Sequence, residues 1–195
     1  MAELKLPASE KTIRNLSVGD FVELSGRMIT GRDEAHKWLI EEQRDEVVPY
    51  LKDSVIYHCG PVVGENEDGS YDFVAAGPTT SIREEPYQAD VICRYGLRGV
   101  IGKGGMGAKT LDGLARCGAV YLHAVGGAAQ VLARAIPRVE KVFMLEEFGV
   151  PEALWVIQVE HFPVMVTMDS HGGSLHDEVE ERSQAKLKEL LGQGT

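Results

Sequence analysis

The hydrophobic positions in the first third of the chain repeat at two different spacings. Over residues 18–24 a Gly-Asp turn is followed by apolar residues that alternate with polar ones, and this period of two predicts a strand. Over residues 35–42 the apolar residues fall at helical spacing, so we expect a helix with Asp33 as its cap. Arg32 is therefore predicted to lie at a strand-to-helix junction.

The second half of the chain alternates more regularly between the two patterns. Strand-like runs at 98–102, 119–124 and 139–144 are separated by helical patterns at 108–117 and 128–135. A β-α-β-α-β series of this kind favours parallel pairing of its strands.

The remaining segments add strands and one more helix. Short strand-like runs at 55–57 and 71–76 flank a polar loop, which is typical of a hairpin or loop connection. Residues 154–168 have a strand pattern interrupted at Pro163, and residues 175–191 have the pattern of a polar helix with a thin apolar stripe. We therefore predict an α/β fold.

The composition is that of one globular domain. With 195 residues, of which 44% are hydrophobic and 26% charged, the chain can bury one good core and only marginally two. We predict a single domain over residues 1–195, with 1–12 and 192–195 as loose termini. The 20 basic and 30 acidic side chains give a net charge of −10, which disfavours nucleic acid as a partner.

No targeting or membrane-spanning pattern is visible in the sequence. The start, Met-Ala-Glu-Leu-Lys-Leu-Pro, lacks the apolar stretch of a signal peptide, and no later window has the length needed to span a bilayer. We expect a cytoplasmic protein that does not act at a membrane.

The three cysteines are widely spaced at Cys59, Cys93 and Cys117. Three thiolates can hold a cubane cluster with one open iron, but the spacing contains no Cys-x-x-Cys chelate. An odd number of cysteines with wide gaps also disfavours a disulfide framework. We expect inert, buried thiols that bind no metal.

The first candidate site is the segment Gly-Pro-Thr-Thr-Ser-Ile-Arg at 77–83, directly after a predicted strand. Gly and Pro favour a tight turn, and Ser81 and Glu84 have the spacing of a capping box. Backbone N–H groups at a helix start, with Arg83 beside them, are suited to bind a carboxylate. The alternative is an ordinary helix cap with a surface arginine.

The second candidate site is Gly-Lys-Gly-Gly-Met-Gly at 102–107, between a predicted strand and a helix. Its glycines fit the pattern of a dinucleotide-binding turn, but no acidic residue stands near the end of the next strand. Leu97 occupies the position where a P-loop requires its first glycine. Lys103 at the positive end of a helix is suited to an anion, the alternative being a solvated lysine in a glycine-rich turn.

The third candidate site is Gly-Arg-Asp-Glu-Ala-His-Lys at 31–37. Arg32 is a possible second clamp for a carboxylate. We expect Asp33, Glu34, His36 and Lys37 to form a solvated helix face.

The motifs together resemble the β subunit of class I fumarases and L-tartrate dehydratases, which are iron–sulfur hydro-lyases. The resemblance extends from about residue 16 to about residue 175 and is carried by the segments 25–37, 57–62, 77–83, 102–106 and 162–172. It implies a single swivelling β/β/α three-layer domain, in which a mixed sheet or partial barrel is flanked by helices. It also implies that the chain is a separate β subunit.

The resemblance assigns roles to four residues of this sequence. Arg32, Arg83 and Lys103 are expected to bind substrate carboxylates, and Thr79 is expected to bind substrate and to act as the catalytic base, with Lys103 beside it in catalysis. Removing a C–H proton next to a carboxylate creates a dianionic intermediate, which fixed cations stabilise. A threonine hydroxyl is a weak base, so this role requires Lys103, Arg83 and helix-end dipoles to stabilise the alkoxide.

The resemblance also implies a partner. The [4Fe–4S] cluster, whose open iron acts as a Lewis acid on the leaving hydroxyl, and the general acid are expected in an α subunit, in an α₂β₂ assembly. The expected reaction is hydration of fumarate to malate, with tartrate dehydration as the alternative. Rival hypotheses are a dinucleotide-binding module that uses residues 102–107 and a non-catalytic ligand-binding or assembly protein.

Overall fold

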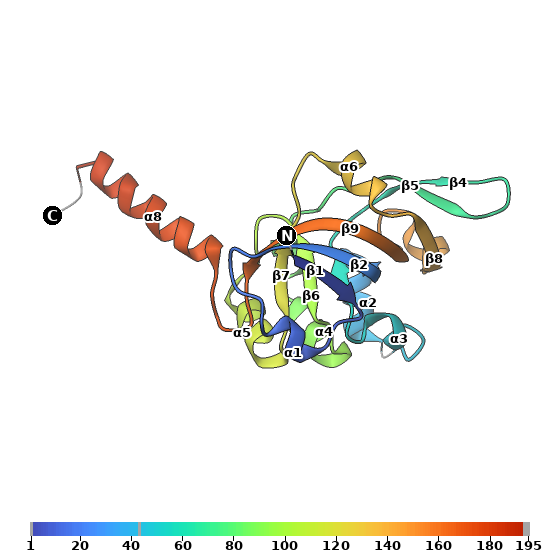
Figure 1. The fold of residues 1–195 in the computed structure, drawn as a ribbon, viewed down its shortest axis with the longest axis horizontal. Helices are drawn as coiled ribbons and strands as arrows, with labels where there is room; N and C mark the ends of the chain where they lie inside the picture. The colour runs from blue at the N-terminus through green and yellow to red at the C-terminus, as the bar shows by residue number, and fades with distance from the viewer. Residues whose placement is uncertain (1, 43, 193–195) are drawn as a thin grey trace.

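The computed structural model of the chain describes residues 2–42 and 44–192 and consists of a closed sheet covered by helices (Figure 1). The strands are β1 (Ala2–Leu6), β2 (Phe21–Thr30), β3 (Val55–Tyr57), β4 (Val62–Glu65), β5 (Tyr71–Ala75), β6 (Gly99–Gly102), β7 (Val120–His123), β8 (Arg138–Phe143) and β9 (Leu154–Met168). The helices are α1 (Glu10–Ile13), α2 (Asp33–Glu41), α3 (Val48–Leu51), α4 (Gln88–Tyr95), α5 (Ala108–Cys117), α6 (Ala129–Arg134), α7 (Leu145–Phe148) and α8 (Leu175–Leu190), and η1 (Ser81–Glu84) is a 3-10 turn.

Strand β9 closes the main sheet into a barrel. The strand order is β1-β2-β3-β6-β7-β9-β8, and β9 also pairs with β2. β2, β3, β6 and β7 run parallel, whereas β9 is antiparallel to both β7 and β2. The predicted α/β fold, with a mixed sheet or partial barrel flanked by helices, is confirmed.

The central parallel strands β3, β6 and β7 are buried on both faces. In β7, Val120 and Leu122 belong to one hydrophobic cluster and Tyr121 to the other, and all three side chains are fully buried. In β3, Tyr57 and Ile56 divide in the same way. Successive side chains point to opposite faces of a strand, so a strand covered on both sides is continuously apolar instead of alternating.

Residues 2–12 are not loose, contrary to the prediction for residues 1–12, of which residue 1 lies outside the described residues. β1 pairs in parallel with β2 from Ala2 to Leu6, and Leu4 and Leu6 are buried in the barrel cluster. Ser9 caps α1 by accepting a hydrogen bond from the Thr12 amide. The polar positions of this segment face solvent, whereas Leu4 and Leu6 bury the inner face of an edge strand. The predicted loose C-terminus, 192–195, lies outside the described residues except for residue 192.

β8 is not the third parallel strand of the predicted series. It pairs antiparallel with β9, with Phe143 opposite Leu154. The edge of β7 that a further parallel strand would need is already occupied by β9, where Leu122 faces Val166. The β-α-β-α-β pattern predicted the elements correctly and the partner of the last strand wrongly. The interruption predicted at Pro163 is absent, since β9 is one strand from Leu154 to Met168.

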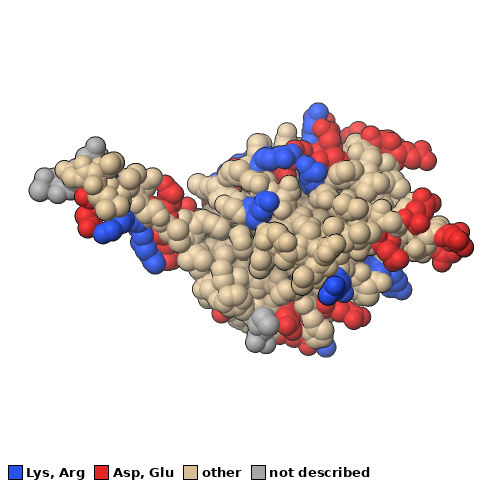
Figure 2. All heavy atoms as spheres, turned by 90° about the horizontal axis from the view of Figure 1, so that it is seen from above, with Lys and Arg blue, Asp and Glu red and all other residues tan. Residues whose placement is uncertain are grey.

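Helix α8 projects away from the barrel (Figure 1). No residue of α8 is buried, and Val179, Leu187 and Leu190 are among its exposed apolar side chains. Acidic side chains gather at the end of the molecule opposite α8, and basic side chains are scattered on the face in view (Figure 2). Within residues 2–42 and 44–192, every helix is too short or too polar to cross a bilayer.

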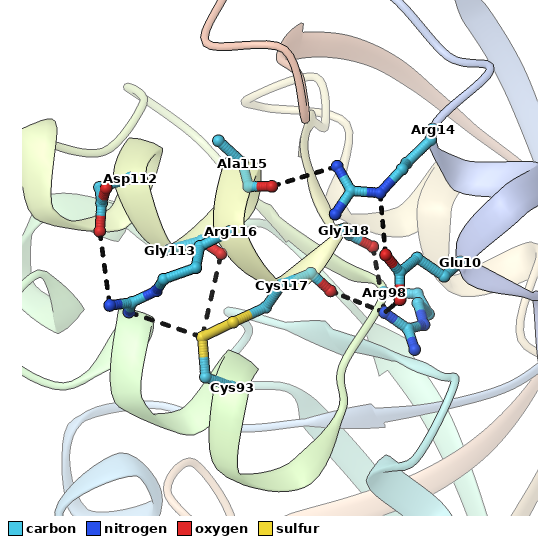
Figure 3. Close-up of a disulfide and its surroundings, with 10 residues drawn as sticks. All are labelled: Glu10, Arg14, Cys93, Arg98, Asp112, Gly113, Ala115, Arg116, Cys117 and Gly118. Carbon is cyan, nitrogen blue, oxygen red and sulfur yellow. Dashed lines mark hydrogen bonds and ion pairs between the residues drawn. A yellow bond between two sulfur atoms is a disulfide. The ribbon is translucent and has the colours of Figure 1, made fainter.

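Two of the cysteines form a disulfide, which corrects the prediction of three inert thiols. Cys93 of α4 and Cys117 at the end of α5 are bonded, with a Cα–Cα distance of 5.5 Å (Figure 3). α4 and α5 pack side by side, so residues 24 positions apart in sequence become neighbours at the distance a disulfide requires. Cys59 remains a free, buried thiol, and burial raises its pKa to about 12.

Candidate functional site

The carboxyl ends of four parallel strands meet at one edge of the barrel, and the segments carrying the predicted site residues meet there. Arg32 follows β2, His58 follows β3 and Lys103 follows β6. The hydrogen-bond ladder continues past the strand ends, because the amide of His58 donates to Ile101 O at 2.8 Å. Parallel strands place their carboxyl ends at the same edge, which is the usual position of ligand sites in α/β sheets.

Backbone hydrogen bonds hold the loop of Thr79 against Lys103, which is bridged to Thr80. The Thr79 amide donates to His58 O at 2.7 Å, and the Lys103 amide donates to Thr79 O at 3.2 Å. The Ser81 amide in turn donates to Lys103 O at 3.1 Å. The Gly-Pro-Thr-Thr loop is thus fixed as a short extra strand against the Gly-Lys-Gly loop, and both side chains are partly exposed.

Arg32 packs against the turn that follows β3. Its Nη1 atom lies 3.3 Å from Glu152 Oε1, and a Cβ atom on Gly60 would come within 2.6 Å of the same nitrogen. A glycine at position 60 therefore leaves room for the guanidinium. Gly60 is next to Cys59, which pairs with Pro78, so Arg32 lies close to the loop that carries Thr79.

Arg83 is held by the first residue of α2. It forms a hydrogen-bonded ion pair with Asp33, and its side chain is 47% exposed. Asp33 is not the helix cap that the sequence predicted. Arg32 occupies the N-cap without a side-chain bond, and the Asp33 carboxylate is turned to Arg83. Burial opposes ionisation of Asp33, but the hydrogen bonds from Arg83 and Glu84 and the charges of Arg83 and Arg32 together outweigh it, and the pKa of Asp33 is lowered.

Glu84, next to Arg83, is a buried carboxyl group beside Asp33, and no N–H or O–H group of the described residues donates to either of its oxygens. Burial, and then the nearby Asp33, raise the pKa of Glu84 to about 8. The group is therefore mostly protonated at neutral pH, because the low-dielectric surroundings disfavour a second negative charge beside Asp33. Protonation of Glu84 keeps the net charge around Arg32 and Arg83 more positive.

The glycines of the Lys103 loop permit close contacts. A Cβ atom on Gly102 would lie 1.8 Å from Ser81 Oγ, and one on Gly105 would lie 2.6 Å from the His176 ring. Gly105 also has a φ of +79°, a backbone conformation that favours glycine. The loop is packed between Ser81 on one side and the first turn of α8 on the other.

The N-terminus of α5 is occupied by a side chain of this protein. The Glu85 carboxylate accepts from the Gly107 amide at 2.7 Å, from the Thr110 amide at 3.1 Å and from Thr110 Oγ1 at 2.6 Å. A dinucleotide pyrophosphate would need these same N–H groups. The geometry therefore argues against a dinucleotide-binding role for residues 102–107.

Two further predictions about local structure are wrong at this site. His36 is fully buried, not part of a solvated face, because α2 packs against α4 on that side. Ser81 does not cap a helix, because its hydroxyl lies inside the protein, 2.8 Å from His58 Nδ1 and 2.9 Å from Tyr121 Oη. His58, Tyr121 and Gln88 were missed as site-forming residues. The only sequence signal for them was the occurrence of His58 within Tyr-His-Cys-Gly-Pro.

A cavity of about 240 Å³ lies beside the site. It is bordered by His123 at the end of β7 and by His176 of α8, and its other lining is mainly apolar. None of the four predicted site residues lines it. Arg32, Thr79, Arg83 and Lys103 instead lie on partly exposed loops at the barrel edge.

The residues of this chain do not fit an iron–sulfur cluster. Cys93 and Cys117 are bonded to each other, and Cys59 is buried alone. Across the described parts of the chain, no three His, Cys, Asp or Glu side chains are grouped so that they could hold a metal ion.

Comparison with known proteins identifies the family. The family model described as "Fumarase C-terminus" matches residues 1–179. A protein named "Putative fumarate hydratase class I" from Geobacillus stearothermophilus is 52% identical over 187 residues, which are 96% of this chain and 36% of that protein. The chain thus spans about a third of the length of that relative.

Two shorter relatives match over most of their length. "Putative L(+)-tartrate dehydratase subunit beta" from Methanocaldococcus jannaschii is 42% identical over 94% of this chain and 95% of its own length. "L(+)-tartrate dehydratase subunit beta" from Escherichia coli K12 is 37% identical over 88% of this chain and 85% of its own length. The resemblance inferred from the motifs is therefore confirmed, and the chain belongs to the fumarase C-terminus family.

Proposed function

We propose that this chain is the β subunit of a two-subunit hydro-lyase that hydrates fumarate to malate reversibly. The observation that carries the proposal is the meeting of Arg32, Thr79, Arg83 and Lys103 on loops at one barrel edge. The names of the relatives support the reaction class, since they include a fumarate hydratase and tartrate dehydratase β subunits. Dehydration of L-tartrate is the alternative, because tartrate also presents two carboxylates to the same cations.

The cations are proposed to bind the substrate carboxylates. Arg83 is the more exposed of the two arginines, and its guanidinium is bound by Asp33, so a substrate carboxylate would compete with Asp33 for it. Arg32 is similarly shared with Glu152. A bidentate guanidinium matches a carboxylate in geometry, and two arginines from different loops suit a dicarboxylic acid.

Thr79 and Lys103 are proposed to act at the reacting carbon. The C–H proton to be removed lies next to a carboxylate, and the dianionic intermediate that results needs positive charge close by. Lys103 directly follows β6 and is bridged to Thr80, and its amide donates to Thr79 O. In this proposal its ammonium stabilises both the alkoxide form of Thr79 and the intermediate. In this assignment Thr79 takes the proton at Oγ1.

The remaining chemistry is assigned to an α subunit. Since no cysteine of this chain fits a cluster, we place the [4Fe–4S] cluster and the general acid in that partner, within an α₂β₂ assembly in the cytoplasm. The partial exposure of the four residues agrees with a site that a facing subunit completes. The subunit names of two relatives support the existence of such a partner.

Coexpression with an α-type chain tests the proposal. The complex is expected to consume fumarate, measured by the loss of its ultraviolet absorbance, and the chain alone is expected to be inactive. Lys103→Ala and Thr79→Ala should each lower kcat at least about 100-fold while the cluster absorbance persists. Lys109→Ala is the matched control, because Lys109 is an exposed lysine in the same region that bonds Pro86 O and Asp90.

The outcomes separate the reaction from the residue roles. A complex that acts on neither fumarate nor tartrate would show that the function is wrong. Full activity of both the Lys103 and Thr79 variants would leave the function standing and remove the two residues from the mechanism.

A further inference from the structure

A hydrogen-bonded network of buried polar side chains lies beneath the candidate site. Its members are His36, Gln88, His58, Ser81 and Tyr121, and the first four have no measurable exposure. At one end of the network His36 Nδ1 lies 2.8 Å from Arg32 O. At the other end the Tyr121 hydroxyl lies 2.9 Å from Ser81 Oγ. Tyr121 is likewise fully buried.

The positions of the hydrogen atoms in this network follow from its geometry. Arg32 O can only accept, so His36 Nδ1 donates to it, and a neutral His36 then has an accepting Nε2. Burial lowers the pKa of both His36 and His58 below the ordinary value for histidine, so both rings are neutral at neutral pH. Their Nε2 atoms lie 2.9 and 2.7 Å from Gln88 Oε1, whereas Gln88 Nε2 has no hydrogen-bond partner. Two accepting nitrogens cannot both bind one carbonyl oxygen, so we exchange the oxygen and the nitrogen of the Gln88 amide.

Only the NH₂ group of Gln88 can serve both rings in this state. One N–H donates to each Nε2, which leaves no amide hydrogen without an acceptor. His58 then donates through Nδ1 to Ser81 Oγ, and the Tyr121 hydroxyl donates to the second lone pair of the same oxygen. Ser81 is thus bound from two sides by groups that cannot reach water.

The hydrogen-bonded network connects each segment that carries a predicted site residue. It begins at the backbone of Arg32, and Ser81 is two residues from Thr79. Ser81 also lies against Gly102, where a Cβ atom would be 1.8 Å from Oγ, and its amide donates to Lys103 O. A shift of the Ser81 side chain therefore moves both the Thr79 loop and the Lys103 loop.

From this geometry we propose that Ser81 and Tyr121 are positioning residues that set the Thr79 loop against the Lys103 loop. This inference rests on the proposed function, because the positioning role of Ser81 and Tyr121 concerns that reaction. Neither hydroxyl touches the substrate in this assignment. Both act by holding Thr79 and Lys103 at the separation that proton removal requires.

The test uses the complex with the α-type chain and two variants, Ser81→Ala and Tyr121→Phe. Each is expected to lower kcat for fumarate about 10- to 100-fold, because small displacements of reacting groups have effects of this size. Hydrogen exchange of the peptide containing residues 79–81 is expected to accelerate in both variants. The double variant should have the kcat of Ser81→Ala alone, since the two residues act through one contact.

Tyr95→Phe is the matched control. Tyr95 is also a buried tyrosine, and its hydroxyl donates to Leu39 O at 2.8 Å, within the helical layer. Its loss should lower the unfolding temperature about as much as Tyr121→Phe and leave kcat and the exchange of residues 79–81 unchanged. The Tyr121 variant also serves if Ser81→Ala does not fold.

The results distinguish failure of the proposed function from failure of the positioning role. A wild-type complex inactive on both fumarate and tartrate would overturn the proposed function. An active wild type in which Tyr121→Phe and Tyr95→Phe have equal kcat and equal exchange would overturn the positioning role alone.

Discussion

Replacing Glu84 with glutamine is expected to make the chain more stable at alkaline pH. The Glu84 side chain is completely buried, and no N–H or O–H group of the described residues donates to either carboxyl oxygen. Its pKa is raised to about 8 from an ordinary value of 4.5 by burial and by Asp33. Glutamine has nearly the same shape as the protonated acid and cannot ionise, so the substitution removes only the cost of the charge.

The sign and size of the effect follow from proton linkage. Between pH 4.5 and 8 the folded chain holds the Glu84 proton more tightly than the unfolded chain does. The stabilisation from this site is therefore complete below pH 4.5 and is lost as the pH rises through 8. One pKa unit corresponds to about 1.4 kcal/mol, so the loss between pH 5.5 and 7.5 is about 1 to 3 kcal/mol, the upper value applying if the pocket does not relax.

Urea unfolding at pH 5.5, 6.5 and 7.5 measures this effect. The free energy of unfolding of Glu84→Gln minus that of the wild type is expected to grow with pH. Glu65→Gln is the control, because it removes one exposed carboxylate from the β4–β5 hairpin and should leave the pH slope unchanged. Equal slopes for Glu84→Gln and the wild type would refute the conclusion that Glu84 carries its proton in the folded chain.

Two further predictions follow from contacts elsewhere in the chain. Gly102→Ala is expected to lower kcat of the complex at least tenfold and to destabilise the chain by about 1 to 3 kcal/mol, because the new Cβ would lie 1.8 Å from Ser81 Oγ. Gly64→Ala, whose nearest contact would be 3.8 Å, is the control, and a Gly102→Ala complex with wild-type kcat would contradict the argument. Reduction of the bond between Cys93 and Cys117 is expected to lower the free energy of unfolding by about 3 kcal/mol, from the 24-residue separation of the two cysteines. Urea unfolding with and without reductant checks this, and identical curves, with both thiols free before reduction, would show that the bond is absent.

Local sequence patterns were sufficient to locate the elements that carry the site. The alternation before Thr30 and the helical spacing after Arg32 placed that arginine at a strand-to-helix junction, as observed. The Gly-Lys-Gly turn was likewise found between β6 and α5. These features depend on neighbours within a few residues, which is the range over which period and turn composition report structure.

Features that depend on distant partners were not predictable in this way. The polar composition of α2 gave no sign that His36 would be buried against Gln88, because that contact spans 52 positions. No sequence motif marks Glu85, whereas its carboxylate binds the N-terminus of α5, 22 to 25 positions further along the chain. The bond between Cys93 and Cys117 required knowledge that α4 and α5 are adjacent.

The position of β2 limits how the candidate site can adapt to different substrates. One edge of this strand is shared by β1 and β3, and the other edge is covered by β9 along most of its length. A strand that is hydrogen-bonded along both edges cannot slide or tilt alone without breaking several backbone hydrogen bonds. The segment that leads to Arg32 is therefore rigidly held. Accommodation of acids that differ in shape must then come from side-chain rotation at Arg32 and Arg83 or from the opposing surface of a partner.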